Sequence, residues 1–322
     1  MMTEMNKKII GQSAKMQELM RAADLVAVTD VPVFISGETG TGKELMAHRV
    51  YQQSHRSKRA FLTINCATLA EEHAESFLFG HKQGAFSGAG TNNPGMIAKA
   101  GSGTLFFDEI SELSLSLQVK LLRFIETGEV QPLGYSSPRH YDVRIIAATS
   151  KNLAEEVKQG NFRADLYFRL NVIPLELPPL RERKEDIPDL MAHFFSEFVR
   201  KQHLTPPGFT QMALKQINKY DWPGNVREIR NFCERLLILF AGKDVDVTNL
   251  PHEMRYFSSL SSGREGSSFS LPENGIKLES VEVDLMLQAL DKSSGNKSKA
   301  ARLLGLSRDT FLYRLKKYSI AL

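Results

Sequence analysis

The stretch VPVFISGETGTGKELMAHRV, residues 31–50, decides the fold of this chain. A short apolar run leads into a glycine-rich loop, and a helical pattern follows the loop. Backbone N–H groups of such a loop can surround phosphate oxygens, and the N-terminus of the next helix favours their negative charge. The loop fits the pattern G-x-x-x-x-G-K, in which the lysine reaches the β- and γ-phosphates of a nucleotide. We therefore predict a nucleotide-binding loop formed by Gly37, Glu38, Thr39, Gly40, Thr41, Gly42, Lys43 and Glu44.

Two adjacent acids, Asp108 and Glu109, end a further apolar run, TLFFDE. Because successive side chains of a strand point to opposite faces, the two acids can have different roles. We predict that Asp108 holds Mg²⁺ through water and that Glu109 polarises the attacking water. Position 44 is Glu where Ser or Thr normally helps to hold Mg²⁺, so the metal would depend more on Asp108. A solvated strand end is the alternative interpretation of the two acids.

Two polar residues end neighbouring apolar runs. Asn65 closes LTIN, and we expect it to hydrogen-bond Glu109 and hold that side chain away from the water until needed. An asparagine satisfied by the backbone is the alternative. Thr149 closes VRIIAAT and is placed to sense the γ-phosphate.

Phosphoryl transfer also requires cations near the developing charge. The segment FRADLYFRL offers Arg163 and Arg169, and WPGNVREIRN offers Arg227 at the start of a helix. We predict Asn225 as the N-cap of that helix. Since arginines more often form surface ion pairs, spacing alone does not separate the two roles.

The order of patterns along the chain predicts several parts. Apolar runs at 31–37, 60–66, 103–109 and 143–150 alternate with helical patterns, which predicts an α/β fold with a parallel sheet covered on both faces. From about residue 178 to 250 only helical patterns are found, and a serine- and glycine-rich segment typical of a flexible linker follows. We therefore assign 1–176 to an α/β subdomain, 177–250 to a helical subdomain, 251–277 to a linker and 278–322 to a terminal helical domain.

The composition is that of an ordinary globular protein. The chain has 322 residues, a net charge of +4 and two cysteines, too few for a disulfide framework or a cysteine zinc site. The N-terminus has no apolar core of a signal peptide, and no run approaches the ~18 apolar residues of a spanning helix. We expect a cytoplasmic protein without membrane insertion.

The last residues carry a basic stripe typical of nucleic-acid binding. The segment 294–320 predicts a helix–turn–helix in which Gly305 allows the turn and Ser307 caps the second helix. A structural helical hairpin is the alternative. Recognition helices meet base edges near their N-terminal half, whereas flanking cations meet phosphates. The predicted DNA contacts are Ser307, Arg308, Thr310 and Tyr313 toward the bases and Arg314, Lys316 and Lys317 toward the phosphates. Helix 281–293 is the expected dimer-pairing helix.

Together these motifs resemble the bacterial enhancer-binding proteins, the AAA+ activators of sigma-54 RNA polymerase. GETGTGKE is similar to their Walker A and GSGTLFFDEI to their Walker B. The resemblance implies an AAA+ P-loop core with a helical lid and an all-α Fis-type helix–turn–helix, using ATP and Mg²⁺. It also implies that Arg163 and Arg169 reach a neighbouring subunit's nucleotide, whereas Arg227, in the sensor II segment, faces its own.

The stretch GAFSGA resembles the loop with which that family contacts sigma-54. It comprises Gly84, Ala85, Phe86, Ser87, Gly88 and Ala89. The resemblance implies that ATP hydrolysis moves Phe86 at the loop tip, and that a second loop at 134–142 lies beside it. The implied partners are sigma-54 RNA polymerase holoenzyme, double-stranded enhancer DNA and further copies of the chain, from a dimer to a hexameric ring.

Three positions depart from the family pattern. Ser87 stands where Thr is usual, Phe77 where Glu is common and Ser150 where Asn is common. The departures at Ser87 and Phe77 keep open a DNA-binding regulator whose ATPase sets only its oligomeric state, without sigma-54. A general AAA+ remodeller such as a helicase loader is a third interpretation. Because the AAA+ pattern begins within about ten residues, as in the phage-shock type of activator, we expect control by a trans-acting inhibitor protein or by expression level rather than by a receiver domain.

Overall fold

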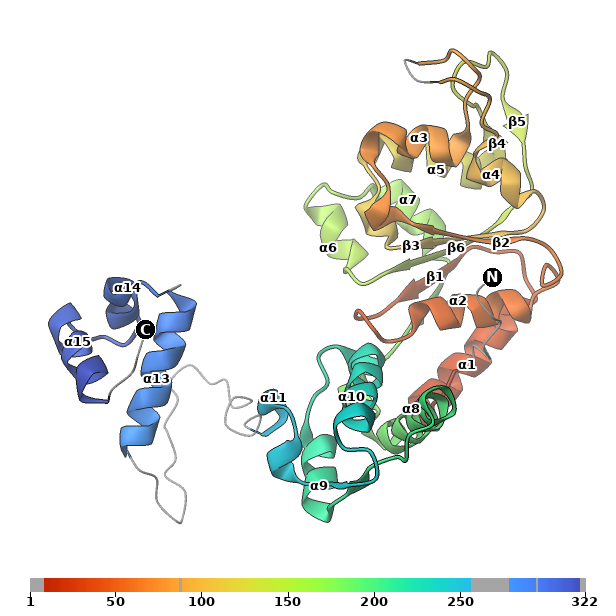
Figure 1. Ribbon diagram of the computed structural model, residues 1–322. Helices are drawn as coiled ribbons and strands as arrows, with labels where there is room; N and C mark the ends of the chain where they lie inside the picture. The colour runs from red at the N-terminus through yellow and green to blue at the C-terminus, as the bar shows by residue number, and fades with distance from the viewer. Residues whose placement is uncertain (1–8, 87–88, 256–277, 294, 319–322) are drawn as a thin grey trace. The chain divides into compact units, whose positions relative to one another are not determined.

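A computed structural model describes residues 9–86, 89–255, 278–293 and 295–318 (Figure 1). Ser87 and Gly88 of the GAFSGA stretch, and 256–277 of the predicted linker, lie outside the described residues. The chain divides into two compact units, Met1–Ser258 and Ser259–Leu322, which are described separately.

The first unit is built on a five-stranded sheet in the order β2-β3-β6-β1-β7, with every pair parallel. All four predicted strands are present, and β7 is an additional one. Its sequence, IPLE, mixes proline and glutamate with apolar residues, so it lacks the apolar character of the others. The strands are β1 (Val33–Ser36), β2 (Phe61–Asn65), β3 (Thr104–Asp108), β6 (Arg144–Thr149) and β7 (Ile173–Glu176).

Helices cover both faces of this sheet, as the alternating apolar runs predict (Figure 1). Successive strand residues enter different cores: Val33 and Ile35 pack with the first helix pair, and Phe34 packs with the helices of the other face. One face carries α1 (Ala14–Ala27) and α2 (Lys43–Gln52). The other carries α3 (Glu71–Phe79), α4 (Gly95–Ala100), α5 (Leu115–Thr127), α6 (Leu153–Lys158) and α7 (Ala164–Leu170). A short antiparallel pair, β4 (Glu129–Val130) with β5 (Arg139–His140), follows α5.

The helical subdomain has its own core around Trp222, which is fully buried. Its helices are α8 (Ile187–Gln202), α9 (Gln211–Lys219), α10 (Asn225–Leu239) and α11 (His252–Arg255). Two features correct the sequence prediction. A two-residue pair, β8 (Gly208–Phe209) with β9 (Asp244–Val245), lies in a region predicted to be free of strands. Because Met254 of α11 is buried in this core, the predicted linker start at 251 falls too early.

Short 3-10 helices connect the elements. They are η1 (Cys66–Thr68), η2 (Ile110–Glu112), η3 (Leu180–Glu182), η4 (Lys184–Asp186) and η5 (Val247–Asn249). Among the described residues, none of the helices has the length and apolar character needed to span a bilayer.

The second unit consists of α13 (Leu278–Lys292), α14 (Lys297–Leu303) and α15 (Arg308–Lys317). Ser307 caps α15 by accepting a hydrogen bond from the backbone N–H of Thr310 at 3.2 Å, as predicted. Gly305 has a φ of +65°, a left-handed conformation that suits glycine at this turn. Phe311 and Leu315 pack against Met286 and Leu290 of α13 in one small core. The predicted helix–turn–helix is therefore present.

Candidate functional site

The phosphate loop joins β1 to α2, and its lysine lies at the centre of the site. Lys43 is the first residue of α2 and is only 7% exposed. Its ammonium group donates a hydrogen bond to the carbonyl of Gly37 at 2.9 Å. It also lies 3.5 Å from Oε1 of Glu109. The structure thus brings together the predicted phosphate-binding lysine and the predicted base that follows β3.

Glu109 is held by three donors on its other carboxylate oxygen. Oε2 accepts hydrogen bonds from the Ser150 backbone N–H at 2.8 Å and the Ser150 hydroxyl at 2.9 Å. The Thr149 hydroxyl lies 3.4 Å away. Burial raises the pKa of Glu109, but the hydrogen bonds from Ser150 and the charge of Lys43 outweigh it and hold that pKa below its usual range. Glu109 is therefore a carboxylate at neutral pH.

The side chains of Asp108 and Glu109 point to different surroundings, but the alternation of side chains along a strand is not the cause. Strand β3 ends at Asp108, and Glu109 follows it with a φ of 52°, in the left-handed region. Such a conformation is uncommon for residues other than glycine and is found at strained functional positions. It is this backbone turn at Glu109, beyond the end of the strand, that gives the acids their different surroundings.

Asp108 has the opposite electrostatic character. Burial and the neighbouring charge of Glu109 raise its pKa, and the attraction of Lys43 offsets this only in part. A partly buried carboxylate short of positive charge suits a hard divalent cation such as Mg²⁺, which binds through one or two carboxylates and keeps several waters. Asp108 thus fits the metal predicted for it. Glu44 lies in the first turn of α2, where a carboxylate suits the helix dipole.

The predicted role of Asn65 is not supported. Its side-chain oxygen accepts a hydrogen bond from the backbone N–H of Ala67 at 3.0 Å and caps η1. No hydrogen bond joins Asn65 to Glu109 in the part of the chain that the structure describes. The backbone satisfies this asparagine, which was the alternative. Ser150, which we noted only as a departure from the family pattern, holds Glu109 instead, and no signal in the sequence pointed to it.

Thr149 lies inside the site. It is fully buried at the end of β6, and its hydroxyl is 2.9 Å from the Ser111 hydroxyl. It also accepts a hydrogen bond from the backbone N–H of Lys151 at 3.0 Å. These contacts place Thr149 against Glu109, where it can fix the strand end that carries Ser150.

The phosphate loop contacts the start of α10 directly. The backbone N–H groups of Val226 and Arg227 lie 3.0 and 3.4 Å from the Gly40 carbonyl. Arg227 is exposed beside this junction. The predicted N-cap is wrong by one residue, because α10 begins at Asn225 and Gly224 precedes it. The Asn225 side chain instead bonds to the phosphate loop.

An apolar cavity of about 220 Å³ lies between α2 and α8, next to the phosphate loop. Sequence reasoning missed it, because its lining comes from four separate segments. Arg183 lies at its polar side, is 1% exposed and donates to the Thr41 carbonyl at 3.0 Å. Burial lowers the pKa of Arg183. The apolar lining includes Ile9, Ile10, Leu45, Met46, Leu177, Leu190, Phe194 and Val226.

The two predicted finger arginines lie on the surface, at either end of α7. Arg163 pairs with Asp165 at 2.7 Å, and Arg169 is exposed. Within the described ranges, no hydrogen bond or ion pair joins either arginine to the phosphate loop of its own chain. Phe168, between them, is 73% exposed, which is unusual for a phenylalanine on a free surface.

The GAFSGA stretch caps a loop whose base is hydrogen-bonded to the second loop. The backbone of His81 exchanges two hydrogen bonds with Asn93, at 2.8 and 2.9 Å. The N–H of Lys82 donates to the Leu133 carbonyl at 2.8 Å, which confirms that the second loop lies beside the first. Phe86, which the resemblance places at the loop tip, is not fully exposed. It is half-buried, with its ring edge-to-face on His81 at 5.0 Å.

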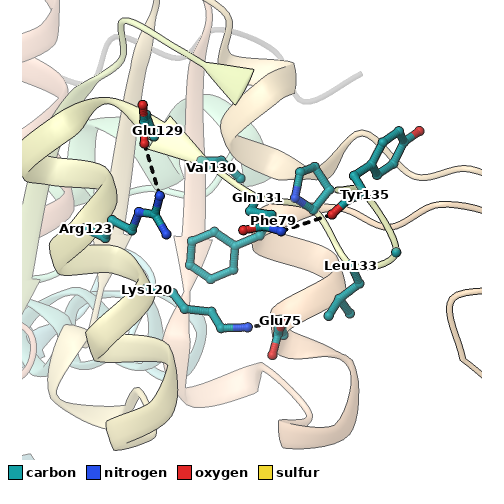
Figure 2. Close-up of a pocket in the computed structure, with 11 residues that line it drawn as sticks. Glu75, Phe79, Lys120, Arg123, Glu129, Val130, Gln131, Leu133 and Tyr135 are labelled. Carbon is teal, nitrogen blue, oxygen red and sulfur yellow. Dashed lines mark hydrogen bonds and ion pairs between the residues drawn. The ribbon is translucent and has the colours of Figure 1, made fainter. Parts of the chain in front are cut away.

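A cavity lies under the second loop, between that loop and helices α3 and α5 (Figure 2). Its volume is about 280 Å³. Phe79 and Val130 form its apolar wall, and Leu133 and Tyr135 line it from the loop. Two ion pairs lie at the rim, Lys120 with Glu75 and Arg123 with Glu129 at 3.2 Å.

The helix–turn–helix presents most of the predicted DNA contacts to solvent. Arg308, Thr310 and Tyr313 are exposed, and Tyr313 is 69% exposed. Lys316 and Lys317 are exposed as well. Arg314 differs from the prediction, because its guanidinium pairs with Glu282 of α13 at 2.5 Å. That arginine therefore braces the unit internally.

Comparisons with known proteins match all three parts of the chain. The Sigma-54 interaction domain matches residues 9–176, the AAA+ ATPase lid domain 181–265, and the Fis family of bacterial regulatory proteins 277–318. The transcriptional regulatory protein ZraR of Salmonella typhimurium is 44% identical over 96% of this chain and 68% of its own length. The transcriptional regulator NtrC of Rhizobium meliloti is 40% identical over 97% of this chain and 70% of its own.

Solved structures agree with this match. NtrX from Brucella abortus in complex with ADP has a TM-score of 0.73 and 29% identity, covering 99% of this chain and 70% of that one. NtrX in complex with ATP has a TM-score of 0.72 and 30% identity, covering 98% and 71%.

The fold and the site together define an AAA+ ATPase joined to a DNA-binding helix–turn–helix. The chain belongs to the sigma-54-dependent transcription activators, the bacterial enhancer-binding proteins. It is an ATP-hydrolysing transcription activator of that class, so the interpretations without sigma-54 and as a helicase loader are not retained.

Proposed function

We propose that this protein couples ATP hydrolysis at the Lys43–Asp108–Glu109 site to a movement of Phe86 that remodels the sigma-54 holoenzyme at promoters. The observation that carries the proposal is the contact of Lys43 with Glu109, 3.5 Å apart at the end of the sheet. It joins a phosphate-binding cation and a charged base in one site.

Each residue of this site has a separate proposed role in ATP hydrolysis. Lys43 binds the phosphates, and the apolar cavity beside α2 accepts the adenine base, because it lies next to the phosphate loop and its apolar lining suits a flat ring. NtrX, a structural neighbour, was solved in complex with ATP and with ADP. Ser150 orients Glu109, which takes the proton from the attacking water. Mg²⁺ near Asp108 would neutralise phosphate charge when bound. Thr149 and Arg227 are proposed to sense the γ-phosphate.

A ring of several copies, a hexamer in this family, completes the site. Arg163 and Arg169 are exposed on α7 and make no contact with the phosphate loop of their own chain in the described ranges. An exposed phenylalanine between two such arginines fits a subunit contact better than a free surface. A second copy of the chain would thus supply the arginines that stabilise the transferred phosphoryl group, an effect worth roughly 10³–10⁵ in rate for arginine fingers.

The C-terminal unit is proposed to bind double-stranded enhancer DNA through α15. Arg308, Thr310 and Tyr313 would meet base edges, with Ser307 at the helix start, and Lys316 and Lys317 would meet phosphates. Helix α13 would pair two copies. The protein would act in the cytoplasm, where a trans-acting inhibitor is the proposed form of control.

Open-complex formation on a sigma-54 promoter, measured beside ATP hydrolysis, tests the coupling. We expect Phe86→Ala to hydrolyse ATP but fail to open the promoter. Leu214→Ala is the control, since Leu214 is an apolar residue 41% exposed on α9 of the helical subdomain, outside the loop. Equal promoter opening by Phe86→Ala and the wild type would contradict the proposed role of the loop.

A further inference from the structure

The turn that leads into α10 has an unusual backbone. Trp222 and Asn225 have φ values of 53° and 52°, and they flank Pro223 and Gly224. Left-handed conformations cost energy in residues other than glycine, and for a bulky residue such as tryptophan they are true outliers. They persist where the surroundings fix them, often at functional positions. Side-chain and backbone contacts on both sides of the turn hold it in this conformation.

The side chain of Asn225 ties three segments together. It is completely buried, and its amide nitrogen lies 3.1 Å from the Thr39 carbonyl and 3.2 Å from a carboxylate oxygen of Glu38. Its amide oxygen accepts a hydrogen bond from the backbone N–H of Leu180 at 2.7 Å. One side chain thus bonds to the phosphate loop on one side and to the start of the lid on the other. Only a donor and an acceptor on one short side chain can do both.

The backbone next to Asn225 completes the junction. The N–H groups of the next two residues, Val226 and Arg227, point at the Gly40 carbonyl of the phosphate loop. Gly40 has a φ of +80°, and a Cβ there would lie 2.4 Å from the Gly224 carbonyl oxygen. The start of α10 therefore sits directly on the phosphate loop, with no space for a side chain between them. Any shift of that loop must move Arg227.

We infer that Asn225 is a positioning residue for hydrolysis: it fastens the start of α10 to Glu38 and Thr39 of the phosphate loop and so sets the place of Arg227 at the nucleotide. The inference rests on the proposed role of Arg227 as a sensor of the γ-phosphate. It goes further by making the Asn225 side chain, rather than the arginine alone, the link between nucleotide and lid.

A double-mutant cycle on ATP hydrolysis tests this link. Asn225→Gly keeps the left-handed turn, because glycine adopts it readily, but removes the side-chain contacts with Glu38, Thr39 and Leu180. A misplacement of about 1 Å can cost up to roughly 100-fold in rate. We expect kcat/KM of Asn225→Gly to fall about tenfold or more, and Arg227→Ala to fall similarly. The double variant should be no slower than Arg227→Ala, because both changes remove one effect.

A second variant covers the case in which Asn225→Gly does not fold. Asn225→Asp keeps the shape and the contact with Leu180 but places an acceptor opposite the Glu38 carboxylate and the Thr39 carbonyl. It should also lose kcat/KM about tenfold or more. Asn218→Asp, on the exposed side of α9, is the matched control and should hydrolyse ATP like the wild type. Thermal unfolding of each variant shows whether it is folded.

Three results of these experiments would contradict the inference about Asn225. Losses that multiply in the double variant would show that Asn225 acts by another route, and the inference would fail. A wild-type rate for both Asn225 variants would overturn it as well. If Arg227→Ala alone hydrolyses ATP normally, the proposed role of Arg227 is wrong and the inference falls with it, which the single variant reveals separately.

Discussion

Replacing Ser150 with alanine tests how Glu109, the proposed water-activating carboxylate, is oriented. The change removes the hydroxyl 2.9 Å from Glu109 Oε2 and leaves the backbone N–H at 2.8 Å in place. A hydrogen bond to a charged group contributes about 1.5–3 kcal/mol. Because the backbone donor remains, we take the lower end, and about 1.4 kcal/mol corresponds to tenfold in rate. We therefore expect Ser150→Ala to lower kcat by about tenfold.

The pattern of the loss identifies its cause. Ser150 touches Glu109 and not the phosphate loop, so KM for ATP should be nearly unchanged. Ser150→Thr keeps the hydroxyl and should retain most of the rate. Glu109→Gln, which removes the base itself, should lose about 10²–10⁴-fold. Ser116→Ala, at an exposed serine of α5, is the matched control.

Single-turnover hydrolysis is the right assay, because product release limits kcat in many enzymes and would hide a slower chemical step. If Ser150→Ala hydrolyses ATP at the wild-type rate in a single turnover, the hydroxyl does not orient the base. A raised KM with unchanged kcat would refute the reasoning in another way, by placing Ser150 in nucleotide binding.

Three further predictions follow from the charges of the site and of the DNA-binding unit. The raised pKa of Asp108 means that its charged form destabilises the folded state above that pKa, and this penalty is lost as the pH falls through it. Asp108→Asn removes the charge and should therefore stabilise the protein at neutral pH by up to about 1 kcal/mol in thermal unfolding. Because it also removes the proposed Mg²⁺ ligand, the same variant should not hydrolyse ATP. Lys43→Ala and Arg169→Ala should each be inactive alone, but a mixture should regain ATPase activity if the arginine acts between copies, and no recovery at any ratio would speak against that. Arg308→Ala should weaken specific DNA binding by about 1–3 kcal/mol, measured by fluorescence anisotropy, whereas Arg314→Ala, whose side chain pairs within its own unit, should change it far less.

Much of this architecture could be predicted from the sequence, because its signals are local. The loop at 37–44 is recognisable from its own eight residues, and the buried parallel strands are visible in the sequence as apolar runs. Capping by Ser307 is likewise a short-range pattern that the structure confirms. Strand β7 was missed because its alternating IPLE pattern lacks that continuous apolar signal.

The contacts that complete the site lie beyond such reasoning. Asn65 ends β2 and Ser150 follows β6 of the same sheet, and both are polar, so spacing cannot tell which one holds Glu109. The left-handed turn at Glu109 points its carboxylate to Ser150, and that choice depends on how β3 and β6 lie side by side. Likewise Asn225 is separated by more than 180 residues from the loop it holds. Long-range hydrogen bonds leave no periodic trace in a sequence.

In the proposed mechanism, the contact between Lys43 and Glu109 links phosphate binding to the release of the base. As the structure stands, the cation that should bind phosphate lies against the base that should activate water, and each offsets the other's charge. A nucleotide's phosphates compete for Lys43, since they carry more negative charge than one carboxylate. When Lys43 turns to them, Oε1 of Glu109 loses its contact with that ammonium group, while Oε2 stays fixed by Ser150. The arrival of substrate therefore frees one oxygen of the base and leaves the other anchored, so that the base is released in an orientation already set.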